Sequence, residues 1–242
     1  PSFIHHLKAE IARKIILKGN DRIEDLNYLD NWDSIVNILK VFNVQKTLDR
    51  ESEGQRFSFE FCRQMTPSLE HIHPQHLAEG DIPFDTLCNW YQDSIIEALH
   101  EPISILDLYL AKESGEKKYK ENLEECKKSI AIIDELFDTL ANIDEAALHN
   151  ICNMALVDKE TNSALGNKMM DGKRVKLYER AKLFDSSNHE KGAYIMTGTW
   201  MVFNKEFSED VRNMKFWEPK DRKKYLEAIE DVYNDFITHL NK

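Results

Sequence analysis

The feature that most restricts the fold of this chain is a short extended segment between two prolines, set in a sequence that otherwise favours helices. Pro67 and Pro74 enclose residues 68–73, and a proline biases the residue before it toward extended backbone. Elsewhere, apolar residues recur at the spacing of amphipathic helices. The sequence therefore predicts a mainly α protein with a small embedded β-hairpin, whose strands we place at about 69–73 and 151–157.

The expected helices end at glycine, proline or clusters of turn-forming residues. They cover residues 3–18, 32–48, 84–99, 102–112, 117–141, 144–149, 162–183 and 219–240, with a loop or short strand between Gly192 and Gly198. A loop at 50–55 predicts a boundary between a helical lead segment, 1–54, and a main domain, 55–242. Because roughly 80 residues separate the two strands, far more than in an ordinary hairpin, we expect a helical insertion at about 77–148.

The first strand carries a pattern that suits metal-assisted hydrolysis, Glu-His-Ile-His-Pro-Gln at residues 70–75. A carboxylate can hold a hard divalent cation, and an imidazole can take a proton from water near neutral pH. We therefore interpret His71 as a general base and Glu70 as a ligand of Mg²⁺ or Mn²⁺. The alternatives are a structural histidine and a zinc site formed by His71, His73 and His76, for which no matching Cys or His cluster is obvious elsewhere.

A second polar cluster occupies residues 152–163. Asn162, at the start of a predicted helix, is the second expected metal ligand, and two protein ligands are adequate for Mg²⁺, which keeps several waters. Asn153 is expected to orient the hairpin or the ring of His71 through hydrogen bonds. His149 precedes this cluster, and it could either touch the site or cap the short helix before it.

Together the two clusters resemble an HNH, or ββα-metal, nuclease, and the wider chain resembles the C-terminal nuclease domain of the GmrSD-type modification-dependent restriction endonucleases. The matching pieces are Arg56-Phe57-x-Phe59, Glu70–Gln75, His149-x-Ile151-x-Asn153, Asn162-Ser163-x-Leu165-x-Asn167, Lys173-Arg174, Thr197 followed by Val202-Phe203-x-Lys205, and Trp217. The resemblance implies an HNH-like core surrounded by helices, and it adds Asn167 and Lys205 to the candidate site.

The same resemblance implies hydrolysis of DNA, possibly modified DNA, in restriction or antiviral defence. In that family a nucleotide-handling domain precedes the nuclease domain. The chain begins at Pro1 without an initiator methionine, so we expect such an upstream domain to be missing from it.

The net charge of −11 argues against a protein that coats nucleic acid by bulk electrostatics. Residues 166–182, however, contain six basic side chains against two acidic ones. We expect Lys168, Lys173 and Arg174 to contact the phosphate backbone. The alternative is a solvated helix face that binds nothing.

Four widely spaced cysteines without a Cys-x-x-Cys pair fit the reduced cytoplasm. No apolar run approaches the roughly 20 residues that a membrane span needs, so no membrane partner is expected. Two other functions remain open: a catalytically inactive DNA-binding or protein-interaction helical module, and a helical adaptor within a larger complex.

Overall fold

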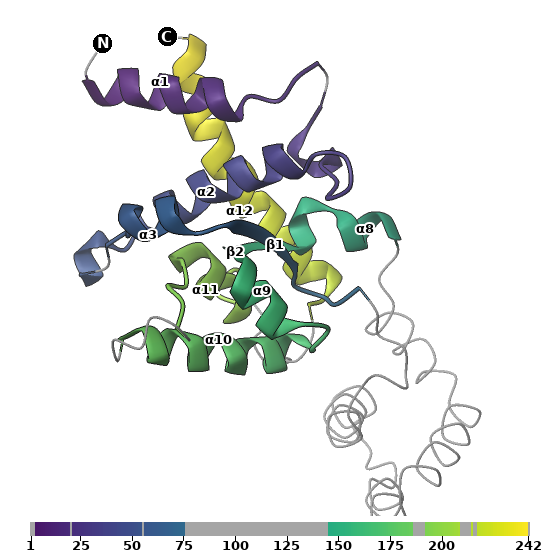
Figure 1. Cartoon of the computed structure of the whole chain (residues 1–242). Coiled ribbons are helices and arrows are strands. Elements are labelled where there is room, and N and C mark those ends of the chain that lie inside the picture. Colours follow the sequence, from purple (N-terminus) through teal and green to yellow (C-terminus); the bar gives the residue numbers. More distant parts are fainter. Residues whose placement is uncertain are drawn as a thin grey trace, which may run out of the picture. The chain divides into compact units, whose positions relative to one another are not determined.

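A computed structural model describes residues 3–19, 21–54, 56–75, 145–185, 192–208, 214 and 217–241 (Figure 1). Contacts group Pro1–Pro74 with Asp144–Lys242 as one compact unit. The helices expected at 84–99, 102–112 and 117–141, and with them most of the expected insertion, lie outside the described residues.

The described part is mostly helical, with η marking the short 3₁₀ helices. Its elements are α1 Phe3–Ile15, η1 Ile23–Asp25, α2 Trp32–Leu48, η2 Glu51–Glu53, α3 Phe59–Gln64, β1 Pro67–His71, α8 Glu145–His149, η3 Ile151–Asn153, β2 Met154–Asp158, α9 Lys159–Leu165, α10 Met170–Asp185, α11 Thr197–Phe203, α12 Pro219–Ile237 and η4 Thr238–Asn241. The prediction of a mainly α chain with one small hairpin is therefore confirmed. No helix among these described residues is both long enough and apolar enough to span a membrane.

The hairpin pairs β1 and β2 antiparallel, with Pro67 opposite Asp158 at one end and His71 opposite Met154 at the other. Both strands differ from the predicted limits. The second begins three residues later than expected, because residues 151–153 form the 3₁₀ turn η3, which Asn150 caps by accepting from the amide of Cys152. The first starts at Pro67 and ends at His71.

The single helix expected at 162–183 is two helices in the structure. Helix α9 follows β2 directly, and the side chain of Asp158 caps it by accepting a hydrogen bond from the amide of Thr161 at 2.8 Å. Gly166 then ends α9 with a φ of +54°, a backbone conformation that glycine adopts most readily. Helix α10 therefore starts in a new direction and lies beside α9 (Figure 1).

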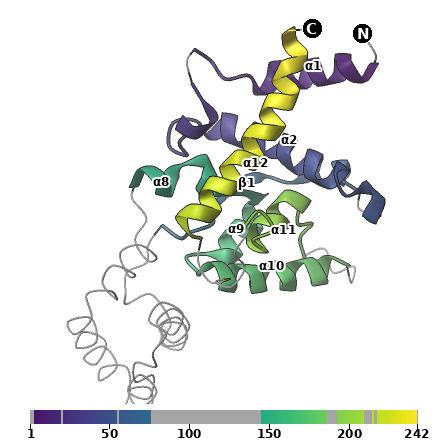
Figure 2. The same cartoon turned by 180° about the vertical axis from the view of Figure 1, so that it is seen from behind.

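Helix α2 lies on one side of the hairpin, and α9 and α10 lie on the other (Figure 1). Seen from behind, α12 crosses α2 (Figure 2). The buried apolar core joins these elements and includes Ile35, Leu39, Phe42, Leu69, Met154, Leu156, Val202, Phe203, Tyr225 and Ile229. The predicted lead segment 1–54 thus contributes α1 and α2 to the same core as the elements that follow it.

Residues 192–196 form the loop expected after Gly192, and helix α11 follows it from Thr197. At Gly198 an added Cβ would lie 2.8 Å from both the ring of Phe42 and Oδ1 of Asn43. The same Asn43 oxygen accepts a hydrogen bond from the amide of Thr199 at 3.0 Å. Close approach to α2 therefore explains why a glycine stands inside this helix, where it otherwise weakens helical structure.

Candidate functional site

The end of β1 is fixed by the buried side chain of Asn153. Its Oδ1 accepts a hydrogen bond from the amide of His73 at 2.8 Å, and its Nδ2 donates to the carbonyls of His73 at 3.1 Å and Leu148 at 2.9 Å. Asn153 itself is 0% exposed. One amide group therefore ties the turn after β1 to helix α8, which agrees with the expectation that Asn153 orients the hairpin.

His71, the last residue of β1, is 8% exposed and faces two other rings. Its Nε2 lies 3.2 Å from Nδ1 of His149, and its ring centroid lies 5.0 Å from that of Tyr28. Burial, and then the charges of nearby groups, of which His149 is the strongest, lower the pKa of His71 from 6.5 to about 3. The imidazole is therefore neutral at ordinary pH, which is the form that can accept a proton.

Of the two roles open to His149, the structure shows contact with the candidate site. The backbone around His149 is bound to a segment much earlier in the chain. Its carbonyl accepts from the amide of Tyr28 at 2.7 Å, and Asn150 Nδ2 donates to the carbonyl of Glu24 at 2.7 Å. Tyr28 was not expected at the site, because no local motif marks it and only the fold brings it there.

Glu70 and Lys173, expected as a metal ligand and a DNA contact, are instead partners in a buried ion pair. The ammonium of Lys173 lies 2.6 Å from Glu70 Oε1, with side chains 1% and 5% exposed. Lys173 also donates a hydrogen bond to the carbonyl of His71. Burial raises the pKa of Glu70 and lowers the pKa of Lys173, while each partner's charge opposes that change. This position removes Lys173 from any surface on which DNA could lie.

Asn162 lies on helix α9, and its side chain forms hydrogen bonds with strand β1. Its Nδ2 donates to Ser68 Oγ at 2.8 Å and to the carbonyl of Leu69 at 2.9 Å, which leaves its Oδ1 as the atom for a ligand. Ser68 and Glu70 leave the strand on one face and His71 leaves it on the other, because side chains alternate along a strand. Asn162 therefore meets β1 at Ser68 and Leu69, toward the end of the hairpin away from His71, and Glu70 and His71 divide between the two faces of the strand.

The chemistry of this donor set fits Mg²⁺ or Mn²⁺ in kind, since a carboxylate and an amide oxygen are hard ligands. The ammonium of Lys173 is already a cation against Glu70, and a divalent ion at this carboxylate would take its place. Within the described ranges, no group of three or more His, Cys, Asp or Glu side chains is arranged to hold a metal. His73 is buried, and His76, the third residue of the zinc alternative, lies outside the described residues.

The remaining polar and basic candidates of residues 166–182 differ in exposure. Lys168 and Asn167 are exposed and Arg174 is half-buried. Arg180 faces inward, where its Nε donates to Thr161 Oγ1 at 2.9 Å. The basic surface expected over 166–182 is therefore smaller than its sequence indicates.

Lys205, expected through the resemblance alone, is fully buried between α11 and α12. Its ammonium lies 2.7 Å from Asp221 Oδ2. Its φ of +54° is the only positive value among the non-glycine residues described, and the amides of Lys205 and Glu206 close the end of α11 on the carbonyls of Val202 and Met201. This pattern usually places glycine there, so the lysine is explained by its ion pair with α12.

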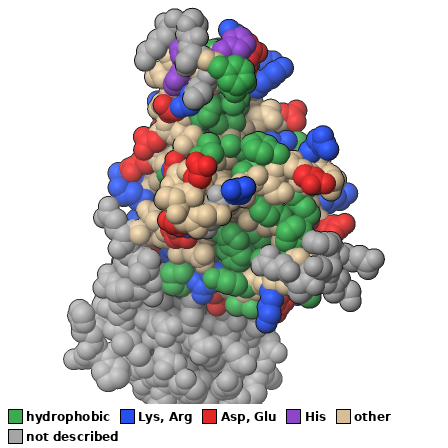
Figure 3. Space-filling model, turned by 90° about the vertical axis from the view of Figure 1, so that its left-hand side faces the viewer, with side chains coloured by type: hydrophobic (Ala, Val, Ile, Leu, Met, Phe, Trp, Pro, Cys, Tyr) green, Lys and Arg blue, Asp and Glu red, His purple; other side chains and the backbone are tan. Residues whose placement is uncertain are grey.

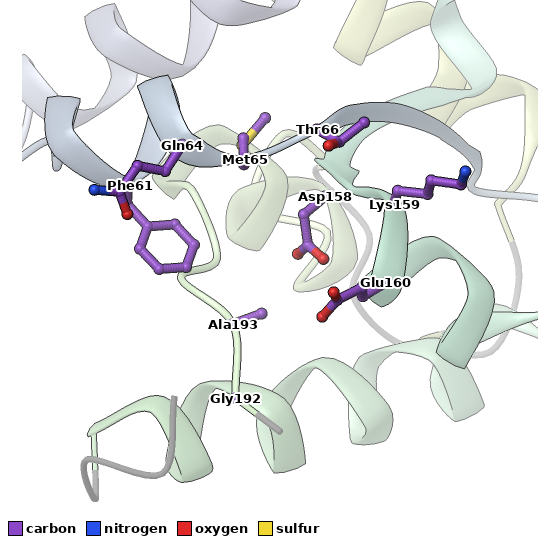
Figure 4. Close-up of a pocket in the computed structure, with 9 residues that line it drawn as sticks. All are labelled: Phe61, Gln64, Met65, Thr66, Asp158, Lys159, Glu160, Gly192 and Ala193. Atoms are coloured by element: carbon purple, nitrogen blue, oxygen red, sulfur yellow. The ribbon is translucent and has the colours of Figure 1, made fainter. Parts of the chain in front are cut away.

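A cavity of about 260 Å³ opens at the opposite end of the hairpin from His71. The ring of Phe61 and the carboxylates of Asp158 and Glu160 line it (Figure 4). Hydrophobic side chains also gather on the face that lies on the left in Figure 1 (Figure 3). Phe57, Phe61 and Tyr194 form an aromatic cluster.

Comparisons of this chain with protein-family models, with curated proteins and with solved structures give no match. The function proposed below therefore rests on the geometry of the hairpin end and on the resemblance of the sequence motifs.

Proposed function

We propose that this chain is a metal-dependent phosphodiester hydrolase of the HNH type that cuts DNA. The observation that supports it best is a neutral imidazole, His71, at the end of a hairpin that is followed at once by a helix. The motif has the order strand, strand, helix in β1, β2 and α9. A hydrogen bond from the Asn162 side chain to the carbonyl of Leu69 connects α9 to β1. A general base must be unprotonated at the working pH, and burial keeps His71 in that state, but a pKa of about 3 also makes its imidazole a weaker base than an ordinary histidine.

In this proposal each polar group of the chain has one task. His71 takes a proton from the attacking water, and Asn153 holds the turn that follows His71 in place. Glu70 and Asn162 Oδ1 would hold the metal after Lys173 moves away from Glu70, and because Glu70 and His71 leave the strand on opposite faces, the end of β1 would have to rearrange for His71 to reach a water beside that metal. When bound, the metal would supply positive charge to the phosphate oxygens and to the leaving oxygen.

DNA is proposed as the substrate because of the resemblance of the motifs, and so is the role in restriction or defence. Lys168 and Arg174 are the basic candidates of the 166–182 stretch that remain at or near the surface. A chain with a net charge of −11 repels a polyanion at long range. We therefore propose weak binding through a few local phosphate contacts.

Cleavage of a supercoiled plasmid tests the proposal. We expect nicked or linear product with Mg²⁺ or Mn²⁺ and none after EDTA is added. Cleavage that persists at full rate in excess EDTA would exclude the metal-dependent mechanism.

A second candidate function is an inactive DNA-binding or protein-interaction module. The specific observation that favours it is the buried Glu70–Lys173 pair, in which the expected metal ligand and the expected DNA contact neutralise each other. Absence of cleavage under all metal conditions, together with retained DNA binding in a gel-shift assay, would favour this module over the nuclease.

A further inference from the structure

A second cavity, of about 250 Å³, lies where helices α10 and α11 meet the loop before α11. Three aromatic residues from three segments line it: Phe184 of α10, Tyr194 of the loop and Trp200 of α11. Arg56 lines it too, and among the described lining residues it is the one that carries a charge. The cavity beside the hairpin, by contrast, has two carboxylates in its lining. The second cavity therefore combines aromatic walls with one positive charge.

Hydrogen bonds and ring packing hold the groups of this cavity in place. The phenol oxygen of Tyr194 accepts from the amide of Ser58 at 3.3 Å and donates to the carbonyl of Arg56 at 3.4 Å. The loop is thereby joined to the segment that carries the guanidinium. The ring of Trp200 packs against Tyr178 at a centroid distance of 4.7 Å, and Tyr178 is 59% exposed. Aromatic surface therefore continues from the cavity to the outside of α10.

The size and the chemistry of the cavity favour a small planar anion. Pockets for drug-sized ligands measure about 300–1,000 Å³, so this cavity suits one ring system rather than a longer ligand. Aromatic side chains stack on planar rings, and a guanidinium pairs with phosphate or carboxylate. Aromatic side chains also attract organic cations, but Arg56 would repel a cation here. A planar ring that bears a negative group is the chemistry of a nucleotide.

We propose that this cavity binds a nucleotide, with the base against Trp200 and Tyr194 and the phosphate paired with Arg56. The site uses no metal and no side chain of the hairpin end, so the proposal stands or falls apart from cleavage. A free nucleotide and a nucleotide within a single strand present the same ring and phosphate. A base inside a duplex is stacked and paired with its neighbours, so duplex DNA is not expected to bind here.

Titration of the full ¹⁵N-labelled chain, followed by NMR in the presence of EDTA, tests the site without metal or cleavage. The probes are deoxyadenosine 5′-monophosphate (dAMP), deoxyadenosine and inorganic phosphate. We expect dAMP to bind more tightly than either of the others and to shift the amide signals of residues 193–197. Equal affinity for dAMP and inorganic phosphate, or shifts that leave residues 193–197 unchanged, would overturn the proposal.

Variants of Trp200 test the stacking contact. Trp200→Leu removes the aromatic surface, and Trp200→Phe keeps a smaller ring. We expect the affinity for dAMP to fall about 5–150-fold in Trp200→Leu, the range for stacking on one aromatic side chain, and to fall less in Trp200→Phe. Phe3→Leu, at an exposed aromatic residue of α1, is the matched control and should bind like the parent. Parental affinity in a folded Trp200→Leu would overturn the proposal.

Arg56, which is exposed, provides a second variant that decides the matter even if Trp200→Leu does not fold. Arg56→Gln should bind dAMP no more tightly than deoxyadenosine. Arg63→Gln, at an exposed arginine on α3, is the matched control and should keep the preference of the parent for dAMP. An unchanged preference in Arg56→Gln would overturn the phosphate contact and with it the proposal.

Short strands identify the source of the nucleotide. Tighter binding of a single strand of deoxyadenosines than of dAMP, lost in Trp200→Leu or Arg56→Gln, would identify a single strand as the ligand. Equal affinity of the two probes would identify a free nucleotide. A duplex of the same length that binds as tightly as the single strand, and loses this binding in the same variants, would overturn the proposal of a base held in the cavity.

Discussion

Replacing Lys173 by methionine tests how strongly the buried pair with Glu70 stabilises the fold. Methionine keeps much of the lysine stem but leaves the carboxylate, 5% exposed, without its cation at 2.6 Å. Removing one partner of a buried ion pair typically costs about 3–5 kcal/mol. For a chain of this size 1 kcal/mol shifts Tm by about 2–4 °C, so we expect Lys173→Met to melt about 6–20 °C below the parent.

Thermal and urea unfolding followed by circular dichroism measure this loss. Lys182→Met, an exposed position on the same helix α10, is the control and should stay within about 0.5 kcal/mol of the parent. The double variant Glu70→Gln/Lys173→Met should recover part of the loss, because a buried amide is less costly than a buried unpaired charge. A loss below about 1 kcal/mol for Lys173→Met would refute the buried pair as a stabilising contact.

The same variant reports on the metal. In Lys173→Met the Glu70 carboxylate has lost the ammonium that lies against it, so Mg²⁺ that binds the folded state should raise the Tm of Lys173→Met. The double variant Glu70→Gln/Lys173→Met lacks the carboxylate and should show no such rise. Equal responses of both variants to Mg²⁺ would show that Glu70 is not a ligand.

Three further predictions follow from single contacts. Asn153→Ala should lower the free energy of unfolding by at least about 1–3 kcal/mol, because the amide and carbonyl of His73 lose a buried partner; urea unfolding checks this. The pKa of His71 is lowered to about 3 in the folded chain, so as the pH falls the unfolded chain takes up a proton first. The free energy of unfolding should therefore fall between about pH 6.5 and 3, by at most about 1.4 kcal/mol per pH unit. His71→Phe should flatten the plot of unfolding free energy against pH over this range, and parallel plots for variant and parent would contradict the prediction. Lys168→Glu with Arg174→Glu should weaken DNA binding in low salt and reduce the salt slope by about 2; an unchanged slope would place the substrate elsewhere.

The sequence was sufficient to predict the hairpin and most of the described helices because their signals are local. Prolines at 67 and 74 enclose the first strand, and the apolar spacing of 32–48 and 219–240 marks two core helices. The break in the helix predicted at 162–183 was missed, although its signal is local: Gly166, followed by Asn167, ends α9. Helix α11 escaped prediction because its glycine and β-branched residues disfavour helix, and packing against α2 overrides that preference.

The candidate site was predictable only in part, because its partners come from distant segments. Glu70, His71 and Asn153 were identified from motifs, and the structure brings them to one end of the hairpin. The burial of Lys173 was not predictable, since a lysine on a charged helix has the same local sequence whether it faces solvent or an internal carboxylate. Tyr28 belongs to no motif and reaches the site through backbone contacts with α8.

Plasmid cleavage by His71→Ala, compared with the parent and with His6→Ala, tests the proposed mechanism most directly. His6 is exposed, so its loss controls for removing a histidine as such. With Mg²⁺ present we expect His71→Ala to remain folded by circular dichroism and to cut about 10²–10⁴-fold more slowly than the parent, the usual effect of removing a general base. His6→Ala should cut at the parent rate. A folded His71→Ala that cleaves as fast as the parent would contradict the role of His71 as the base.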